Sequence, residues 1–235
     1  MGQKVNPLSF RVGYSVKWKS CWMADEDFGN RLYEDYEIRK YLSNTCGAGI
    51  AEITIERSSG SERGDNELIT IHISTCFSGI MIGKNGEKIK TLTNALRKRF
   101  KHNFQIDIVD VKRRDIIAKL VAEWIASQIE NRFSYRSVAK KAMVNVMKNN
   151  VNGVKIQISG RLGGGEIARS EQFRMGRVSA HTMRSDLDFY CGKAKTVYGI
   201  IGVKVWIYRK DILHRLPTLS GTMSLLADGK QEKRR

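Results

Sequence analysis

The residues best suited to hold a charged ligand form a short loop, Gly83-Lys84-Asn85-Gly86. Two glycines three positions apart lack the Cβ atoms that would keep a ligand away from the backbone. A helical pattern begins at Glu87, and the unpaired N–H groups of its first turn favour phosphate. Lys84 adds a mobile charge, and Lys88 is the second residue of the helical pattern. This spacing predicts a clamp for a phosphate-containing chain.

A second segment concentrates positive charge at helical spacing. Arg132, Arg136 and Lys140 recur every four residues, which predicts one face of a helix, and Lys141 follows beside them. From residue 112 to residue 148 there are nine Lys or Arg and three Asp or Glu. A face that serves solubility alone normally mixes the two signs. We interpret the helix as a surface that follows phosphates, with a merely soluble surface as the alternative.

A third segment, residues 159–177, interleaves arginines with glycines. Glycine lets the chain follow an irregular surface, and the planar guanidinium group binds phosphate through two hydrogen bonds. The expected phosphate contacts are Arg161, Arg169, Arg174 and Arg177. Phe173 has two interpretations, a base-stacking residue or a core residue.

Other kinds of chemistry find little support in the sequence. The four histidines, at positions 72, 102, 181 and 214, are isolated from one another, and no segment matches the glycine-rich phosphate loop of nucleotide hydrolases. The four cysteines, at positions 21, 46, 76 and 191, are too far apart for a zinc ribbon. We interpret them as reduced, mostly buried thiols. We therefore expect no enzyme, no metal, no cofactor and no small-molecule substrate.

The overall charge indicates the kind of partner. The 235 residues include 41 Lys or Arg and 24 Asp or Glu, a net charge of +17. Such an excess repels itself unless a polyanion neutralises it, and nucleic acid is the commonest polyanion partner. The longest apolar stretch is interrupted by Lys119 and Glu123, so we expect no membrane partner.

Hydrophobic periodicity divides the chain into two α+β units between a basic arm, residues 1–20, and a flexible basic tail, residues 211–235. The arm carries Lys4 and Arg11, which we expect to contact nucleic acid; a frayed terminus is the alternative. In residues 21–111 a helix is expected over 27–43, with Phe28, Leu32, Tyr36 and Tyr41 as its apolar stripe. Alternating isoleucines then predict strands around residues 53–55, 69–73 and 104–108, with the helix from Glu87 before the last strand.

In residues 112–210 two amphipathic helices are expected to pack on a mainly antiparallel sheet. Its strands are predicted around residues 154–158, 187–190 and 203–207. The loop of the first unit, placed after a strand and a short helix, resembles the Gly-x-x-Gly loop of KH domains, which clamps about four nucleotides.

Four segments together resemble the bacterial-type ribosomal protein S-three family of the small subunit. They are MGQKVNPLSFRVG, GIMIGKNGEKI, ISGRLGGGEIAR and TVYGIIGVKVWIY, and the resemblance spans residues 1 to 210. It implies a type-II KH domain, a family-specific α/β domain and a place in the subunit head, bound to rRNA. It also implies neighbours of the S-ten and S-fourteen families. A free KH-type RNA regulator is the alternative function.

The same resemblance implies that the second domain lines the mRNA entry channel. The family's residues implicated in unwinding message map to Arg136, Lys140 and Lys141, but Ser137 stands where a further Arg is usual. Cys76-Phe77-Ser78 replaces the usual Ala-Arg-Pro, and Glu171-Gln172-Phe173 replaces Glu-Trp-Tyr. The family implies either the cytoplasmic ribosome of a bacterium or a mitochondrial matrix ribosome.

Overall fold

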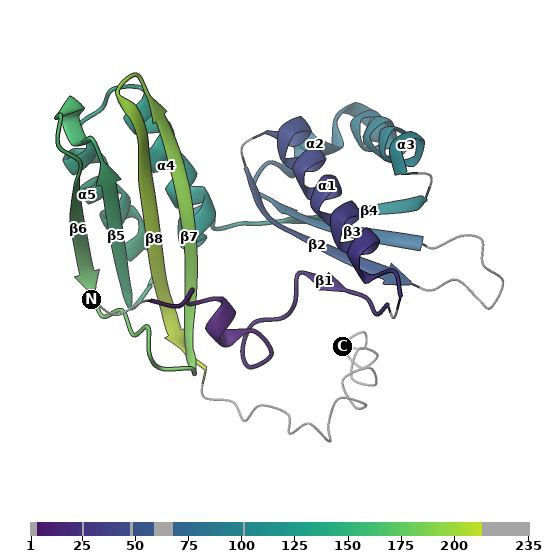
Figure 1. Cartoon of the computed structure of the whole chain (residues 1–235), viewed down its shortest axis with the longest axis horizontal. Coiled ribbons are helices and arrows are strands. Elements are labelled where there is room, and N and C mark those ends of the chain that lie inside the picture. The colour runs from purple at the N-terminus through teal and green to yellow at the C-terminus, as the bar shows by residue number, and fades with distance from the viewer. Residues whose placement is uncertain (1–3, 25, 48, 59–67, 101, 213–235) are drawn as a thin grey trace, which may run out of the picture.

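The computed structural model describes residues 4–24, 26–47, 49–58, 68–100 and 102–212, and for Asn85 only the backbone. Two four-stranded sheets, each with its own helices and its own hydrophobic core, make up the two α+β units (Figure 1). The fold class predicted from the sequence is confirmed. Most of the predicted basic tail lies outside the described residues, whereas Asp211 ends the last strand.

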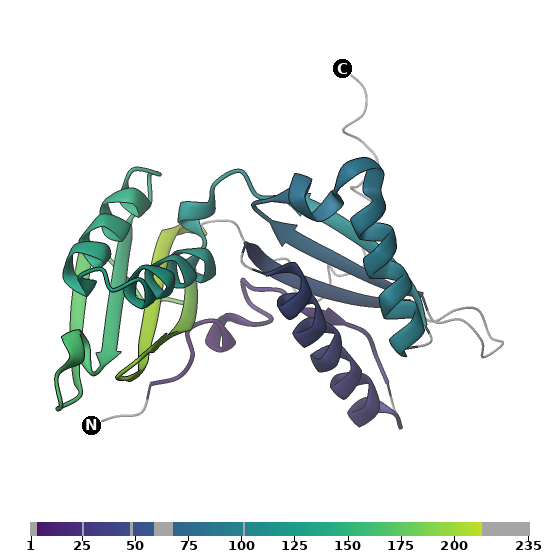
Figure 2. The same cartoon turned by 90° about the horizontal axis from the view of Figure 1, so that it is seen from above.

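The first unit is a sheet in the order β1-β2-β3-β4 with its helices packed on one face (Figure 2). The strands β2 and β3 are antiparallel, whereas β3 pairs with β4, and β1 with β2, in parallel. The elements in chain order are β1 (Ser20–Cys21), α1 (Phe28–Cys46), β2 (Ile50–Ser58), β3 (Leu68–Thr75), α2 (Ser78–Ile82), α3 (Glu87–Phe100) and β4 (Asn103–Asp110). The predicted isoleucine strands are therefore confirmed.

The helix α1 is confirmed, but of its predicted apolar stripe only Tyr41 packs against the core. Phe28, Leu32 and Tyr36 are all more than half exposed, while Asp35 is fully buried together with Ile38 and Leu42. The Asp35 carboxylate accepts hydrogen bonds from Ser20, Trp22 and Arg57, the last at 2.7 Å. Because these partners come from other elements, helical periodicity alone could not reveal which face turns inward.

The second unit is an antiparallel sheet in the order β6-β5-β8-β7, with two helices on one face (Figure 1). The predicted pair of helices on a mainly antiparallel sheet is confirmed. The backbone N–H of Ala118, the first residue of α4, donates a hydrogen bond to Asp188 at 2.8 Å. Its elements are α4 (Ala118–Glu130), α5 (Tyr135–Met147), β5 (Gly153–Gly160), β6 (Arg169–Gly176), β7 (Ser185–Thr196) and β8 (Gly199–Asp211).

The strand β6 lies in the glycine-arginine segment, residues 159–177, where the sequence predicts phosphate contacts but no strand. It pairs with β5 along its whole length and forms the edge of the sheet. Its sequence, RSEQFRMG, has little hydrophobic alternation because most of its side chains face solvent. Phe173 packs against the core of this unit, which favours the core interpretation.

The N-terminal arm connects the two units (Figure 1). The buried side chain of Arg11 donates to backbone carbonyls of the second unit, including those of Thr182 at 2.8 Å and Ser185 at 3.0 Å. Farther along, Ser20 and Cys21 pair with β2 of the first unit. The arm is thus bonded to both units, at Arg11 and at Ser20–Cys21, and is not a frayed terminus between these residues.

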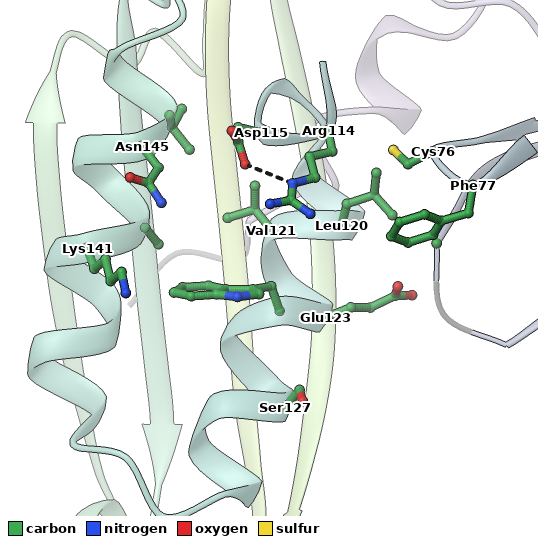
Figure 3. A pocket seen from close by; sticks show the side chains of 14 residues that line it. Cys76, Phe77, Arg114, Asp115, Leu120, Val121, Glu123, Ser127, Lys141 and Asn145 are labelled. Carbon is green, nitrogen blue, oxygen red and sulfur yellow. Dashed lines mark ion pairs between the residues drawn. The ribbon is translucent and has the colours of Figure 1, made fainter. Parts of the chain in front are cut away.

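A cleft of about 460 Å³ lies between the two units. Phe77 forms part of one wall, Lys141 and Asn145 of α5 form part of the other, and α4 lies between them with Glu123 (Figure 3). Cys76 also lines the cleft, half-buried. The expectation of mostly buried thiols is wrong, because Cys21 and Cys191 are exposed.

Candidate nucleic-acid interface

The Gly83–Gly86 loop joins α2 to α3 through a short 3₁₀ turn, Lys84–Gly86. Gly83 and Gly86 have φ angles of 72° and 75°, in the left-handed region that side chains rarely adopt. A Cβ atom on Gly83 would also lie 2.8 Å from Cγ of Lys88. Both glycines are therefore required by the backbone, and the loop leads directly into the first turn of α3.

The charges around this loop are arranged for an anionic ligand. Lys84 is exposed, and the ammonium group of Lys88 donates a hydrogen bond to the Ile80 carbonyl at 3.1 Å, which holds Lys88 across the loop. Ile80 and Ile82 of α2 are 65% and 38% exposed, so apolar surface adjoins the clamp. Sequence reasoning missed these two isoleucines, because an apolar residue on a short helix gives no sign of being exposed.

The basic surface of α5 is only partly as expected. Arg136, Lys140 and Lys141 are exposed, and α5 contains neither Asp nor Glu. Arg132 does not belong to this helix, which begins at Tyr135; it lies in the preceding turn with φ of 64°. The predicted stripe of Arg132, Arg136 and Lys140 is therefore wrong at Arg132, which is exposed in the turn before the helix.

Glu171 of β6 organises the basic side chains beside α5. Its carboxylate accepts hydrogen bonds from Tyr135 at 2.9 Å and from Arg136 at 3.0 Å, and it lies 3.9 Å from Nε of Arg169. The hydrogen bond from Arg136, followed by that from Tyr135, lowers the pKa of Glu171 below its ordinary range. The same hydrogen bond raises the pKa of Arg136. Arg136 and Arg169, far apart in sequence, are brought together here.

The other predicted arginines take separate positions. Arg161 donates to the Gly165 carbonyl at 2.9 Å and to the Tyr198 carbonyl at 3.3 Å, so it ties the glycine turn to the β7–β8 hairpin. Arg177 is exposed just after β6. Arg174 lies on the opposite face of β6 from Glu171, paired in register with Lys155.

The sequence predicts that Arg11 contacts nucleic acid, but this residue lies inside the protein. Its side chain is 0% exposed and donates to Pro7, Ala180, Thr182 and Ser185. Its guanidinium group is occupied within the protein. Lys4, by contrast, is exposed. After burial, its charge is the next cause that lowers the pKa of Lys155.

No helix in the described part of the chain is both long and apolar enough to cross a membrane. In the same part, no cluster of three or more His, Cys, Asp or Glu residues could bind a metal ion. What the geometry does provide is a glycine-flanked clamp at a helix start, exposed lysines and a second basic helix. These features define an RNA-binding protein of the KH class.

Comparison with known families supports both units. Residues 37–116 match the family model "KH domain", and residues 125–207 match "Ribosomal protein S3, C-terminal domain". Small ribosomal subunit protein uS3 of Staphylococcus epidermidis is 44% identical over 94% of this chain and 99% of its own length. The uS3 protein of Lawsonia intracellularis is 44% identical over 92% of this chain and 98% of its own length.

The chain belongs to the uS3 family of small ribosomal subunit proteins. The resemblance predicted from the four sequence segments is confirmed. This family is structural and not enzymatic, so the prediction that the chain is not an enzyme is also confirmed.

Proposed function

We propose that the chain is a structural constituent of the small ribosomal subunit that binds rRNA through its KH loop, while α5 lines the path of incoming mRNA. The observation that carries the mRNA role is the exposed face of α5, where Arg136 and Lys140 lie one turn apart on a helix without carboxylates. Such a face attracts phosphate irrespective of base sequence, as a channel that admits every message requires.

The contact residues fall into two sets, one for each unit. The first set surrounds the KH loop: Gly83, Lys84, Asn85, Gly86 and Lys88. The second set lies on the second unit and the arm: Lys4, Arg132, Arg136, Lys140, Lys141, Arg161, Arg169, Arg174 and Arg177. We divide the chain accordingly into the arm (1–20), the KH domain (21–111), the family-specific domain (112–210) and the tail (211–235).

The exposed apolar side chains of α1 support a contact between this helix and a neighbouring protein. Phe28, Leu32, Tyr33 and Tyr36 are between 52% and 65% exposed, a cluster of a kind that usually marks a protein contact. We assign this surface to a protein neighbour in the subunit head, of the S-ten or S-fourteen family. The bacterial relatives support a ribosome in the bacterial cytoplasm as its location.

Sedimentation of the native protein tests the role in the ribosome. The protein should co-sediment with small subunits through a high-salt cushion and be released when the rRNA is digested with nuclease. A free KH-type regulator would remain at the top of the gradient bound to other RNAs. That outcome would contradict the proposal.

A further inference from the structure

The sheet of the second unit has one face covered by α4 and α5 and one face without helices (Figure 1). Alternation along the strands places the core residues on the covered face and their neighbours on the open face. The open face carries Arg174 of β6, Lys155 of β5, Lys204 of β8, and Lys193 and Lys195 of β7. On this face there is no Asp or Glu among the described residues of β5, β6 and β7, nor on β8 as far as Tyr208; Asp211 lies beyond the register shift, opposite Ser185.

The strand register arranges these cations along a diagonal. Arg174 pairs with Lys155, and Lys155 pairs with Trp206. Two residues before Trp206 on β8, Lys204 pairs with Cys191, and the next residue of β7 on this face is Lys193. Diagonal neighbours on adjacent strands are about 7–8 Å apart. The cations therefore form a continuous diagonal track across the sheet, from Arg174 at one edge to Lys193 at the other.

The cations on this track repel one another. Burial lowers the pKa of Lys155, and the neighbouring charges of Lys4 and Arg174 lower it further. The repulsion among Lys155, Lys4 and Arg174 raises the free energy of the isolated folded protein unless an anion binds between them. Glu130 lies near the far end, but it accepts its hydrogen bond from the Lys195 backbone N–H.

The aromatic residues on this face hold the track in position. The ammonium group of Lys155 lies 4.9 Å from the centre of the Trp206 ring, and Phe189 packs against the same ring at 5.1 Å. With Lys155 and Phe189 both against it, Trp206 has little free ring surface on which a base could stack. The face is therefore suited to a sugar-phosphate backbone and not to reading base sequence.

We propose that this open face, through Arg174, Lys155, Lys204 and Lys193, binds the phosphate backbone of an rRNA segment laid diagonally across the sheet. The inference rests on the proposed ribosomal function and adds a contact surface separate from the KH loop and from α5. Sequence reasoning found Arg174 and Lys4 but missed the three lysines, because their common face depends on the pairing of distant strands.

A matched pair of triple variants tests this surface in the full-length chain. The first, Arg174→Gln with Lys193→Gln and Lys204→Gln, removes three exposed charges from the track. The control, Lys17→Gln with Lys40→Gln and Lys112→Gln, removes three exposed charges elsewhere. The measurement is the affinity for a small-subunit rRNA transcript by fluorescence anisotropy at several salt concentrations. Thermal melts followed by circular dichroism verify that both variants fold.

The track variant should lose about 2 units from the slope of log K against log salt, because each phosphate contact contributes ~0.7. The control should keep nearly the wild-type slope. Equal slopes in the two variants, with the wild type still binding RNA, would overturn this inference alone. Failure of the wild type to bind the transcript would overturn the proposed function as well.

Lysine acetylation of native small subunits identifies what covers the face. Lys193 and Lys204 should react more slowly in the subunit than in the free protein, and nuclease digestion should restore their reactivity. Full reactivity in the intact subunit would mean that the face is bare. Protection that survives complete RNA digestion would mean that a protein covers it. Either of these results contradicts the proposal.

Discussion

The carboxylate of Glu171 on β6 accepts two hydrogen bonds from the guanidinium group of Arg136 on α5, at 3.0 and 3.3 Å. The pair joins the edge strand that sequence reasoning missed to the helix proposed to line the mRNA path. One carboxylate thus lies within the basic surface that α5 and β6 form. It fixes the position of Arg136, and it also competes with any phosphate that approaches Arg136.

Replacing Glu171 with Gln should strengthen RNA binding. The amide still accepts a hydrogen bond from Tyr135, but it no longer neutralises Arg136, so a phosphate meets less competition. We expect affinity for a single-stranded RNA to rise about two- to fivefold at low salt, as for other exposed ion pairs. Fluorescence anisotropy measures the change. Glu166→Gln, an exposed position nearby, is the control; an equal gain there would assign the effect to net charge.

The hydrogen bonds between Arg136 and Glu171 also predict how the stability of the fold depends on pH. The folded-state pKa of Glu171 is lowered, mainly by the hydrogen bond from Arg136. A lowered pKa means that the interaction stabilises the fold above the unfolded-state pKa and is lost as pH falls through the folded-state value. In a carboxyl ¹³C NMR titration, Glu171 should titrate below the ordinary range of glutamate. Arg136→Ala should raise the midpoint; an unchanged midpoint would exclude Arg136 as the cause.

Arg11 should matter for stability and not for RNA contact. Its buried guanidinium group satisfies carbonyls from both the arm and the second unit. Arg11→Ala leaves these acceptors without a donor and should lower the free energy of unfolding by about 3 kcal/mol. Arg11→Lys should restore only part of the loss, because lysine lacks the planar fork. Urea denaturation measures both, with exposed Lys17→Ala as the control. A loss no larger than that of the control would contradict the structural role.

Local periodicity predicted most of the secondary structure but not the tertiary roles. The isoleucines of β2, β3 and the valines of β8 alternate because one face of each strand is buried, and that signal lies within the sequence itself. The burial of Asp35 and Arg11 depends on partners 22 and 174 residues away, respectively, which no local pattern reveals. The turn at Arg132 was missed because a four-residue spacing of basic residues can continue across a helix boundary.

The candidate site was also only partly predictable from the sequence. The KH loop was found because its glycines are required by the local backbone, with φ angles of 72° and 75°. The Arg136–Glu171 pair and the lysines of the open face depend on strand pairing in the second sheet. Sequence reasoning named Arg136 and Arg169 as RNA contacts, but it could not place Glu171 between them.

The KH loop gives a direct test of RNA binding by the first domain. Lys84→Asp with Asn85→Asp adds negative charge at the clamp while both glycines remain, so binding to single-stranded RNA should weaken and the melting curve should not change. Lys40→Asp with Asn44→Asp makes the same charge change on exposed positions of α1 and serves as the control. If the loop variant binds RNA as well as the control does, the clamp does not contact RNA.

The helix α5 should assist the passage of structured messages. Arg136→Ala with Lys140→Ala and Lys141→Ala removes three exposed charges, and alanine maintains the helix because it has the highest helix propensity. Subunits carrying the variant should assemble and should translate an unstructured message normally. They should slow on a message with a stable downstream hairpin, because fewer phosphate contacts hold the opened strand.

This defect should be partial, because Glu171 already neutralises part of Arg136 and the exposed Ser137 adds no positive charge beside it. The matched variant is Ser137→Arg, which adds a positive charge to α5 where the triple variant removes three. It should speed translation through the hairpin. Equal slowing of the triple variant on both messages would indicate a general assembly role for α5. If neither variant changes the rate on the hairpin message, α5 does not act on incoming mRNA.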